Sequence, residues 1–238
     1  MKMIKNSMVP LYQQLSDEIR RQITDGKLQT GDRLPTEAEL SQEFMVSRIT
    51  VRKAIELLVD DGIVVRRQGI GTFVAQKKVH RVIHNQAVSF TDMSLLSGQE
   101  PSAELISVEK IMPDASIASH LHIGEEEQVL KLVRLRKNDG KPVMIEENYY
   151  PKKMFFLLQE NLLGSTYEIF RNKDYIPTHF LKTVEICYAT ADEARYLEVE
   201  ENQALILQKD ETSDQNGEMI HYSKLLINPN RYRLTIVI

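Results

Sequence analysis

The spacing of apolar residues changes at Gly62, and this change constrains the fold more than any other feature of the chain. Between residues 10 and 61, apolar side chains recur every three or four positions, as they do along the buried face of a helix. After Gly62, residues 63–67 and 72–74 have the composition of strands and flank the glycine-containing turn 68–71. The sequence therefore predicts three helices followed directly by a β-hairpin.

Local signals mark where the three helices begin and end. Pro10 supplies a fixed φ for the first helix, in which apolar residues recur every four positions until Gly26. Thr36 and Glu39 form a T-x-x-E capping box for the second helix. Ser47 is a suitable N-cap for the third. The second and third helices are therefore separated by only a short turn.

The third helix is predicted to have one apolar side and one basic side. Its apolar side forms the expected core face: Val51, Ala54, Ile55 and Leu58. The opposite side carries Arg48, Ile49, Arg52 and Lys53. Two helices joined by a short turn, with a basic first turn on the second, are typical of a helix-turn-helix motif that enters the major groove of DNA. Arginine can donate two hydrogen bonds to guanine, and an exposed isoleucine can contact a thymine methyl group.

The hairpin after the third helix is predicted to be a basic wing. Arg66 and Arg67 supply charge for phosphate or for a narrowed minor groove, and the turn glycines let the backbone approach closely. The charge balance agrees, because residues 1–78 hold 13 Lys and Arg against 10 Asp and Glu, whereas residues 79–238 hold 17 against 24. This asymmetry indicates one module that meets a polyanion and one that does not.

The first module allows two other interpretations. The three helices could serve protein contact, with the basic residues forming a solvated face. Gly69 and Gly71 could instead cradle a nucleotide, but their turn joins two strands, opens no helix and is not followed by G-K-[ST]. The agreement of charge, apolar period and wing glycines favours DNA binding.

The rest of the chain is predicted to form a mainly antiparallel sheet with packed helices. Six segments have strand character: 129–136, 143–150, 180–188, 204–211, 219–227 and 234–238. Three have helical patterns: 115–121, 153–158 and 192–197. Turns at 138–141 and 214–217 would join two pairs of strands as hairpins. Residues 77–86 are polar without a clear period and are expected to form a linker.

Arg134 and Arg136 lie two positions apart on a predicted strand and therefore face the same side of the sheet. Two neighbouring guanidinium groups repel each other unless carboxylates or a bound anion neutralise them, and phosphate fits such a pair best. The alternative is an exposed strand face with both side-chain tips in water. The residues alone leave these two interpretations open.

The first module resembles the DNA-binding domain of the GntR family of bacterial transcription regulators. The resemblance is carried by residues 34–41, 46–54 and 68–74. It implies base and phosphate contacts from Arg33, Ser47, Arg48, Thr50 and Arg52, and wing contacts from Gln68 and Gly69. In some family members a basic residue occupies the position of Ala38, so the resemblance implies no such contact from the second helix here.

The second module resembles the UTRA effector domain of the HutC subfamily, whose fold is similar to that of chorismate lyase. The matching segments are 89–93, 132–136, 142–146, 165–167 and 217–223, with Tyr149, Pro151, Arg231 and Tyr232. Together the resemblances imply an α+β protein with three parts. These are a winged helix-turn-helix domain at 1–76, a linker at 77–86, and an effector-binding and dimerisation domain at 87–238.

The resemblance also implies an effector site. In members that bind sugar phosphates, phosphate is held by residues matching Phe90, Thr91, Arg134, Arg136 and Ser165, and a carboxylate matching Glu146 reads the polar body of the ligand. Thr166, Tyr167 and His221 complete the expected site. His221, Ile227 and Asn230 stand where many relatives have glutamate, tyrosine and aspartate. The expected effector is a phosphorylated sugar or glycoside, and the residues expected to contact its sugar differ from those of many relatives.

Composition excludes several classes of protein. Cys187 is the only cysteine, so neither an internal disulfide nor a cysteine-built zinc site can form. No apolar stretch approaches the roughly 20 residues of a membrane-spanning helix, and no secretory signal is visible. His120 and His122 would share a face only on a strand, and they precede an acidic run that indicates a helix end, so no metal site is expected. No cofactor is expected either.

We therefore expect a cytoplasmic homodimer that binds double-stranded, near-palindromic operator DNA and represses sugar or amino-sugar uptake and catabolism genes. A phosphorylated sugar would release or modulate it. One alternative is an enzyme with a chorismate lyase-like domain, in which Glu146, His179 or His221 could act as a general base. Others are a regulator that responds to a non-phosphorylated carboxylate and an architectural DNA-binding protein without a ligand.

Overall fold

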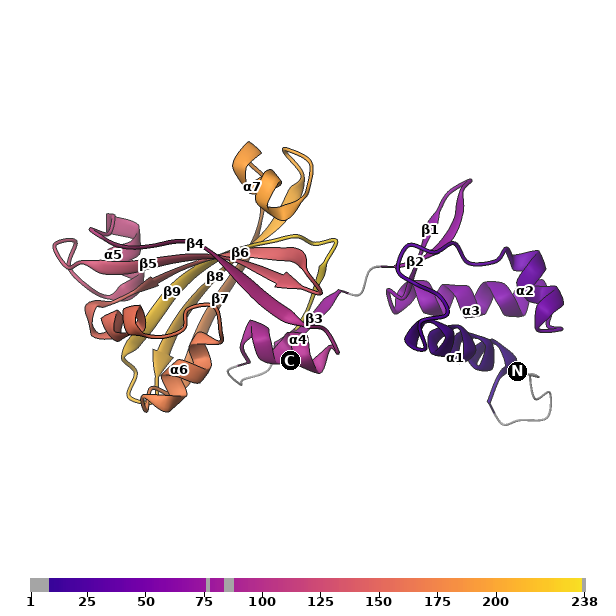
Figure 1. Cartoon of the computed structure of the whole chain (residues 1–238), viewed down its shortest axis with the longest axis horizontal. Helices are drawn as coiled ribbons and strands as arrows, with labels where there is room; N and C mark the ends of the chain where they lie inside the picture. Colours follow the sequence, from indigo (N-terminus) through magenta and orange to yellow (C-terminus); the bar gives the residue numbers. More distant parts are fainter. Residues whose placement is uncertain (1–8, 76–77, 84–87, 237–238) are drawn as a thin grey trace. The chain divides into compact units, whose positions relative to one another are not determined.

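The computed structural model describes residues 9–75, 78–83 and 88–236. The chain divides into two compact units, residues 1–78 and 79–238 (Figure 1). The first unit contains the predicted three helices and hairpin. Its elements are α1 (Leu11–Thr24), α2 (Glu37–Glu43), α3 (Arg48–Asp60), β1 (Val64–Arg67) and β2 (Gly71–Val74).

Helix caps and one apolar core organise the first unit. Thr36 and Glu39 form the predicted capping box, and Ser47 Oγ accepts a hydrogen bond from the Thr50 backbone N–H at 3.1 Å. The predicted apolar face of α3 is buried and packs against α1 and the base of the hairpin. Burying one leucine side chain contributes about 2 kcal/mol. This face fixes α3 in place and leaves its basic face in water.

The β1–β2 hairpin is anchored to the segment that precedes α2. The Leu34 N–H donates to the Thr72 carbonyl at 2.8 Å, and Arg33 forms an isolated antiparallel bridge to Phe73. The hairpin is therefore held on two sides, by α3 and by the chain entering α2. This places Arg33 beside the wing.

The second unit is built on a six-stranded sheet of order β4-β5-β6-β9-β8-β7, in which every neighbouring pair is antiparallel. Its strands are β4 (Pro101–Ile111), β5 (Val129–Asn138), β6 (Lys141–Tyr150), β7 (Pro177–Tyr188), β8 (Ala204–Asp214) and β9 (Met219–Ile227). The prediction of a mainly antiparallel sheet with packed helices is confirmed.

Helices cover both faces of this sheet. They are α4 (Phe90–Leu96), α5 (Ala115–Leu121), the 3-10 helix η1 (Lys152–Gln159), α6 (Thr166–Asn172) and α7 (Ala191–Leu197). In Figure 1, α4 and α6 lie on one side of the sheet and α7 on the other. Phe170 of α6 packs against Leu132 and Tyr150, and Leu197 of α7 packs against Leu135 and Leu205.

The segment expected to be a linker contains a strand. Within residues 77–86, β3 (Val79–Ile83) pairs in parallel with β10 (Tyr232–Ile236) as a separate two-stranded sheet. Residues 77 and 84–86 lie outside the described residues, as do 237 and 238 of the strand expected at 234–238. The partner of β3 lies at the other end of the unit in sequence, so local composition could not reveal the pairing.

β4, α4 and α6 were not predicted from the sequence. Each of the two helices has seven residues, the same length as α5 and α7, which were predicted, so length does not explain the difference. β4 is a largely exposed edge strand of the sheet and lacks a clean alternation of apolar and polar residues. The strands with the most buried side chains, β5, β6 and β9, were predicted.

The turn between β5 and β6 requires left-handed backbone at two positions. Asp139 has φ of 49° and Gly140 has φ of 74°, as in a type I′ hairpin turn. Glycine adopts this conformation without strain, whereas a Cβ makes it unfavourable.

Replacing Gly140 with alanine should lower the free energy of unfolding by about 1 to 2 kcal/mol, because the new side chain is strained in left-handed backbone. Urea denaturation of the full chain followed by circular dichroism would measure the loss. Lys141→Ala, next to it and exposed, is the matched control. Equal stability of the two variants would contradict the strain argument.

Candidate functional site

The exposed face of α3 presents predicted DNA-contact residues in its first two turns. Arg48 and Ile49 are exposed, and Ile49 keeps 80% of its surface accessible. Core packing does not explain so exposed an isoleucine. The hydroxyl oxygens of Ser47 and Thr50 lie 2.8 Å apart at the start of the helix. These four residues form one continuous surface at the N-terminal end of α3.

Two other predicted DNA-contact residues lie over aromatic rings. The Lys53 ammonium is 4.2 Å from the centroid of the Tyr12 ring on α1. The Arg67 guanidinium is 5.0 Å from the centroid of the Phe73 ring within the hairpin. Lys53 is thus directed toward α1, and Arg67 toward the surface of the wing.

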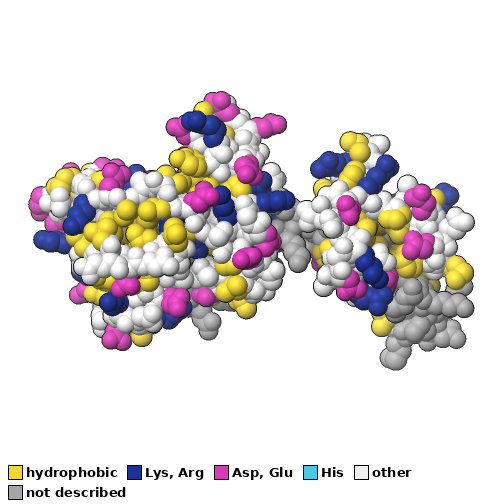
Figure 2. All heavy atoms as spheres, viewed as in Figure 1, with side chains coloured by type: hydrophobic (Ala, Val, Ile, Leu, Met, Phe, Trp, Pro, Cys, Tyr) yellow, Lys and Arg dark blue, Asp and Glu magenta, His cyan; other side chains and the backbone are white. Residues whose placement is uncertain are grey.

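A shallow hollow lies between the hairpin and the start of α2. Its lining consists of Arg33, Glu37 and residues 66–72. Gln68 and Gly69 form the exposed tip of the hairpin, and Figure 2 shows Lys and Arg side chains on both sides of that tip. A Cβ on Gly71 would lie 2.8 Å from Arg33 Nε, so glycine permits this close approach. The structure therefore brings Arg33 and the wing residues together.

Glu37 joins the two basic elements and was not predicted. Its carboxylate lies 3.1 Å from a terminal nitrogen of Arg52 on α3 and 3.4 Å from one of Arg66 on β1. Arginines from the third helix and the wing thus share one carboxylate. The sequence signal was weak because an acid in the first turn of a helix is ordinarily explained by the helix dipole.

Arg134 and Arg136 are buried side by side on β5, with exposed fractions of 1% and 2%. Arg134 donates to the carbonyls of Leu162 and Gly164 at 2.6 and 3.1 Å, and Arg136 donates to the Gly164 carbonyl at 3.3 Å. The predicted common face is confirmed. The alternative interpretation, with both tips in water, is wrong.

The start of α4 contacts the same cluster. Arg136 donates to Thr91 Oγ1 at 2.9 Å, and its guanidinium lies 4.7 Å from the centroid of the Phe90 ring. Ser165 follows Gly164, whose carbonyl accepts from both arginines, and it caps α6. The start of α4 and the loop 162–165 therefore meet at the two arginines.

Glu146 on β6 supplies the carboxylate of this cluster. Its Oε2 accepts from Arg134 at 2.6 Å and lies 4.0 Å from Arg136 Nε. Burial alone would raise the pKa of Glu146, but the two guanidinium groups outweigh burial and lower it. Burial lowers the pKa of Arg136 to about 10. Because arginine stays protonated at neutral pH, the cluster carries two positive charges against one negative charge.

A pocket lies beside Glu146, between α4, α6 and the sheet. Five predicted effector residues line it: Phe90, Glu146, Thr166, Tyr167 and His221. The other four do not line it but adjoin it in space or in sequence: Thr91, Arg134, Arg136 and Ser165. The predicted effector residues are therefore gathered in one place, with the arginines behind Glu146.

Three polar residues of the pocket were missed: Asn148, Asp210 and Ser223. The register of the sheet places Ser223 opposite both of the others. Ser223 Oγ donates to Asn148 Oδ1 at 2.8 Å, and Asp210 lies 2.5 Å from Lys182 Nζ. The alternation along β6 and β9 could have indicated two of these residues. Asp210 could be found only from the pairing of β8 with β9.

His221 is a neutral imidazole in this pocket at pH 7. Burial lowers its pKa to about 4, against the opposite effect of the Asp210 carboxylate. Its Nδ1 lies 2.8 Å from Ser223 Oγ, and its ring lies among those of Tyr150, Tyr167 and Phe170. A neutral imidazole can donate one hydrogen bond and accept another.

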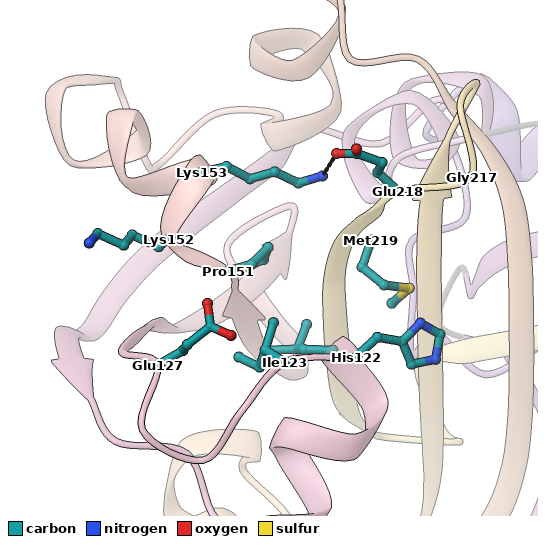
Figure 3. A pocket seen from close by; sticks show the side chains of 10 residues that line it. His122, Ile123, Glu127, Pro151, Lys152, Lys153, Gly217, Glu218 and Met219 are labelled. Carbon is teal, nitrogen blue, oxygen red and sulfur yellow. Dashed lines mark hydrogen bonds and ion pairs between the residues drawn. The ribbon is translucent and has the colours of Figure 1, made fainter.

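A second hollow lies where the end of α5, the start of η1 and the β8–β9 turn meet (Figure 3). Its floor is apolar and its rim carries His122, Glu127, Lys152, Lys153 and Glu218. Lys153 and Glu218 form an ion pair of 2.6 Å across it. These rim charges are exposed and of both signs, and no predicted effector residue lies there. The pocket beside Glu146 is therefore the candidate site.

Within residues 9–75, 78–83 and 88–236, no group of three or more His, Cys, Asp or Glu side chains is arranged to hold a metal ion. His120 instead pairs with Glu211 at 2.7 Å and stacks on the Tyr222 ring, and His122 ends α5. In this same described part of the chain, every helix is too short or too polar to cross a membrane.

Family models match both units. Residues 11–74 match the bacterial regulatory proteins of the gntR family, and residues 96–233 match the UTRA domain. The chain belongs to the GntR family.

Relatives named as transcriptional repressors match this GntR-family chain along nearly its whole length. It is 31% identical to the HTH-type transcriptional repressor NagR of Bacillus subtilis, covering 96% of this chain and 94% of the relative. It is 33% identical to the probable fructoselysine utilization operon transcriptional repressor of Escherichia coli, covering 95% and 93%. The crystal structure of PhnF from Mycobacterium smegmatis matches with a TM-score of 0.83 and 26% identity, covering 94% and 98%.

The family assignment decides the class of function. This GntR-family chain is a DNA-binding transcriptional repressor with a UTRA domain for a small-molecule effector. Since the family and its relatives are regulators, the enzyme alternative is wrong.

Acid should destabilise the wild-type chain more than a His221→Gln variant. The folded chain holds His221 at a pKa of about 4, below the ordinary value of 6.5, so the unfolded chain binds a proton that the folded chain does not. The stability that the neutral imidazole contributes is present above pH 6.5 and is lost as pH falls toward 4. The full loss is on the order of 3 kcal/mol.

Melting temperatures measured from pH 7 to pH 4.5 would test this. The wild-type curve should fall more steeply than that of His221→Gln, while His122→Gln, altered at an exposed histidine, should follow the wild type. Parallel curves for wild type and His221→Gln would refute the buried neutral imidazole.

Proposed function

We propose that this repressor binds a near-palindromic operator as a homodimer through α3 and the wing, and that a phosphorylated sugar bound in the pocket beside Glu146 modulates this binding. The observation that carries the effector proposal is the charge of the buried cluster. Two guanidinium groups face one carboxylate, which leaves one positive charge to be neutralised. An anionic group at this place removes that imbalance.

The DNA side of the proposal rests on the exposed basic surfaces of the first unit. Arg48, Ile49 and Arg52 would reach base edges from α3, with Ser47, Thr50 and Lys53 contacting the backbone. The wing would contribute the contacts of Arg66, Arg67, Gln68 and Gly69, with Arg33 beside it. The exposed Ile49 fits a thymine methyl group, because no protein neighbour covers it among the described residues.

The phosphate would bind between the start of α4 and the loop before α6. Thr91 and Ser165 supply hydroxyl groups there, and Arg136 already contacts Thr91. The Nε atoms of Arg134 and Arg136 are buried and make no hydrogen bond within the described residues, so the cluster retains donor capacity. Guanidinium groups and hydroxyls are the usual side-chain ligands of phosphate.

The sugar would face the polar row of the pocket. His221, Asn148 and Ser223 offer donors and acceptors at neutral pH, and Asp210 offers a carboxylate. A ring bearing several hydroxyl groups suits such a mixed surface. The Escherichia coli relative named for fructoselysine utilization supports a sugar derivative as the class of effector.

A non-phosphorylated carboxylate is the second candidate effector. It would also neutralise one positive charge, and it would meet His221 where many relatives have a glutamate that would repel it. The two candidates differ in the number of oxygen atoms offered to the arginines and hydroxyls, so they can be separated by measurement.

A chain of packed elements connects the pocket to the point where the chain enters this unit. Arg136 contacts Phe90, and Phe90 and Met93 of α4 pack with Tyr232 of β10. β10 pairs with β3, which begins at Val79, at the boundary between the two units. An effector that moves α4 would therefore act on the strand that follows the DNA-binding unit.

The edge of the sheet supports a homodimer. Among the described strands, β7 pairs with β8 alone. Leu181, Ile186 and Tyr188 on β7 are 61, 75 and 67% exposed. A long apolar edge strand invites pairing unless something covers it. A second copy would cover it and supply the two-fold symmetry that a near-palindromic site needs.

Replacing Arg48 with alanine should weaken operator binding by about 1 to 3 kcal/mol, because a forked contact to a base is lost. Fluorescence anisotropy with a duplex from the chain's own promoter, at several salt concentrations, would measure it. Arg195→Ala, an exposed arginine of α7 in the other unit, is the control. A wild-type chain that attaches to no duplex in a salt-sensitive manner would remove the DNA proposal. Sedimentation of the same sample would show whether the chain forms the proposed homodimer.

Replacing Arg136 with glutamine should abolish the effector response and leave DNA affinity nearly unchanged, because the anion site and the α3 surface lie in different units. A panel of sugar phosphates, each with its free sugar and its sugar acid, would be titrated into the operator complex. Response to phosphates alone supports the first candidate, and response to the acids alone supports the second. If no compound of the panel changed operator binding, or if the variant lost DNA binding as strongly as it lost the effector response, the effector assignment would be contradicted.

A further inference from the structure

Glu37 occupies an unusual place for a carboxylate, between arginines of α3 and of the hairpin. It is the first residue of α2, and its side chain is two-thirds buried between α3 and the hairpin. Its oxygen atoms face Arg52 and Arg66, which come from the two elements proposed to contact DNA. A negative charge here opposes phosphate, so it weakens general attraction to a duplex.

The geometry shows what Glu37 does for Arg52. Glu37 lies 3.5 Å from Arg52 Nε and 3.1 Å from one terminal nitrogen, which is the side edge of the guanidinium group. The end edge, formed by the two terminal nitrogens, remains available for a guanine. The long side chain is thereby held in one orientation before any contact with DNA, although 61% of it is exposed.

A helix-stabilising role does not account for these contacts. An acid in the first turn of α2 favours the helix by about 0.3 to 1 kcal/mol. Glu39, in the same turn, already supplies such a charge and closes the capping box with Thr36. Glu37 differs from Glu39 because its carboxylate is turned toward arginines of two other elements.

We propose that Glu37 is a positioning residue that sets the sequence specificity of the DNA interface. It holds Arg52 so that its free edge meets a base, and it offsets the charge of Arg52 and Arg66 so that arbitrary duplex binds weakly. This inference rests on the proposed DNA interface. It assigns to an acidic residue a role in discrimination that adds to the base contacts of the arginines.

Neutralising Glu37 should therefore raise the affinity for random-sequence duplex and lower the discrimination between DNA sequences. Glu37→Gln keeps the shape and removes the charge, which frees two arginines to bind phosphates anywhere. Affinity for random-sequence duplex should rise about three- to tenfold, and the slope of log affinity against log salt should steepen by about one to two units. Discrimination between sequences should fall, because Arg52 is no longer held.

The experiment uses the full chain and a random-sequence duplex library, so no operator needs to be known. Wild type, Glu37→Gln, Glu43→Gln and Arg52→Ala would each select bound duplexes for sequencing, and anisotropy titrations against unselected library would give affinity and salt slope. Glu43 lies at the other end of α2, so Glu43→Gln matches the charge change without the arginine contacts. Melting temperatures check that each variant is folded.

Wild type and Glu43→Gln should enrich the same motif, whereas Glu37→Gln should relax the base positions that Arg52→Ala also relaxes. A folded Glu37→Gln chain with the motif and salt slope of Glu43→Gln overturns the inference and leaves the DNA interface standing. A misfolded Glu37→Gln chain overturns it too, since the role would then be structural. A wild-type chain that enriches no motif and shows no salt dependence overturns both proposals.

Discussion

The ion pair between Arg134 and Glu146, with Arg136 beside it, is the interaction on which the second unit depends. It lies in the interior, where removing one partner leaves a buried charge that costs about 3 to 5 kcal/mol. The two arginines also tie the loop at Leu162 and Gly164 and the start of α4 to the sheet. The cluster thus holds the loop, the start of α4 and the sheet together, and it is also the proposed anion site. An effector bound there would therefore contact elements that already contact one another.

The two units place their arginines in opposite electrostatic environments. The first exposes its arginines and offsets two of them with one carboxylate, Glu37, at an accessible surface where each ion pair contributes little to stability. The second unit buries Arg134 and Arg136 in its interior, where water cannot screen them and a missing contact is costly. Exposed charge suits a long polyanion that approaches from solvent, and buried charge suits a small ligand that is enclosed. The same residue type therefore serves two functions in one chain.

Local patterns predicted the helices of the first unit, the wing and the strands of the sheet, because caps, turn glycines and apolar period are short-range signals. These local patterns could not predict the pairing of Arg134 with Glu146. Next to the turn, Lys137 lies opposite Pro142, and that register continued would place Arg134 opposite Ile145. A bulge between Arg136 and Lys137 shifts the register by one residue and brings Glu146 to the same face as the arginines. The row containing Asp210 and the pairing of β3 with β10 likewise depend on contacts between distant segments.

The pairing of β3 with β10 has a consequence for how the chain comes to work during its synthesis. The ribosome releases the DNA-binding unit first, and that unit has its own core, so it can fold while the rest is still being made. β3 follows at once, but the strand with which it pairs, β10, lies at the other end of the second unit in sequence and leaves the exit tunnel much later. The DNA-binding unit of a nascent chain can therefore be folded before β3 and β10 pair.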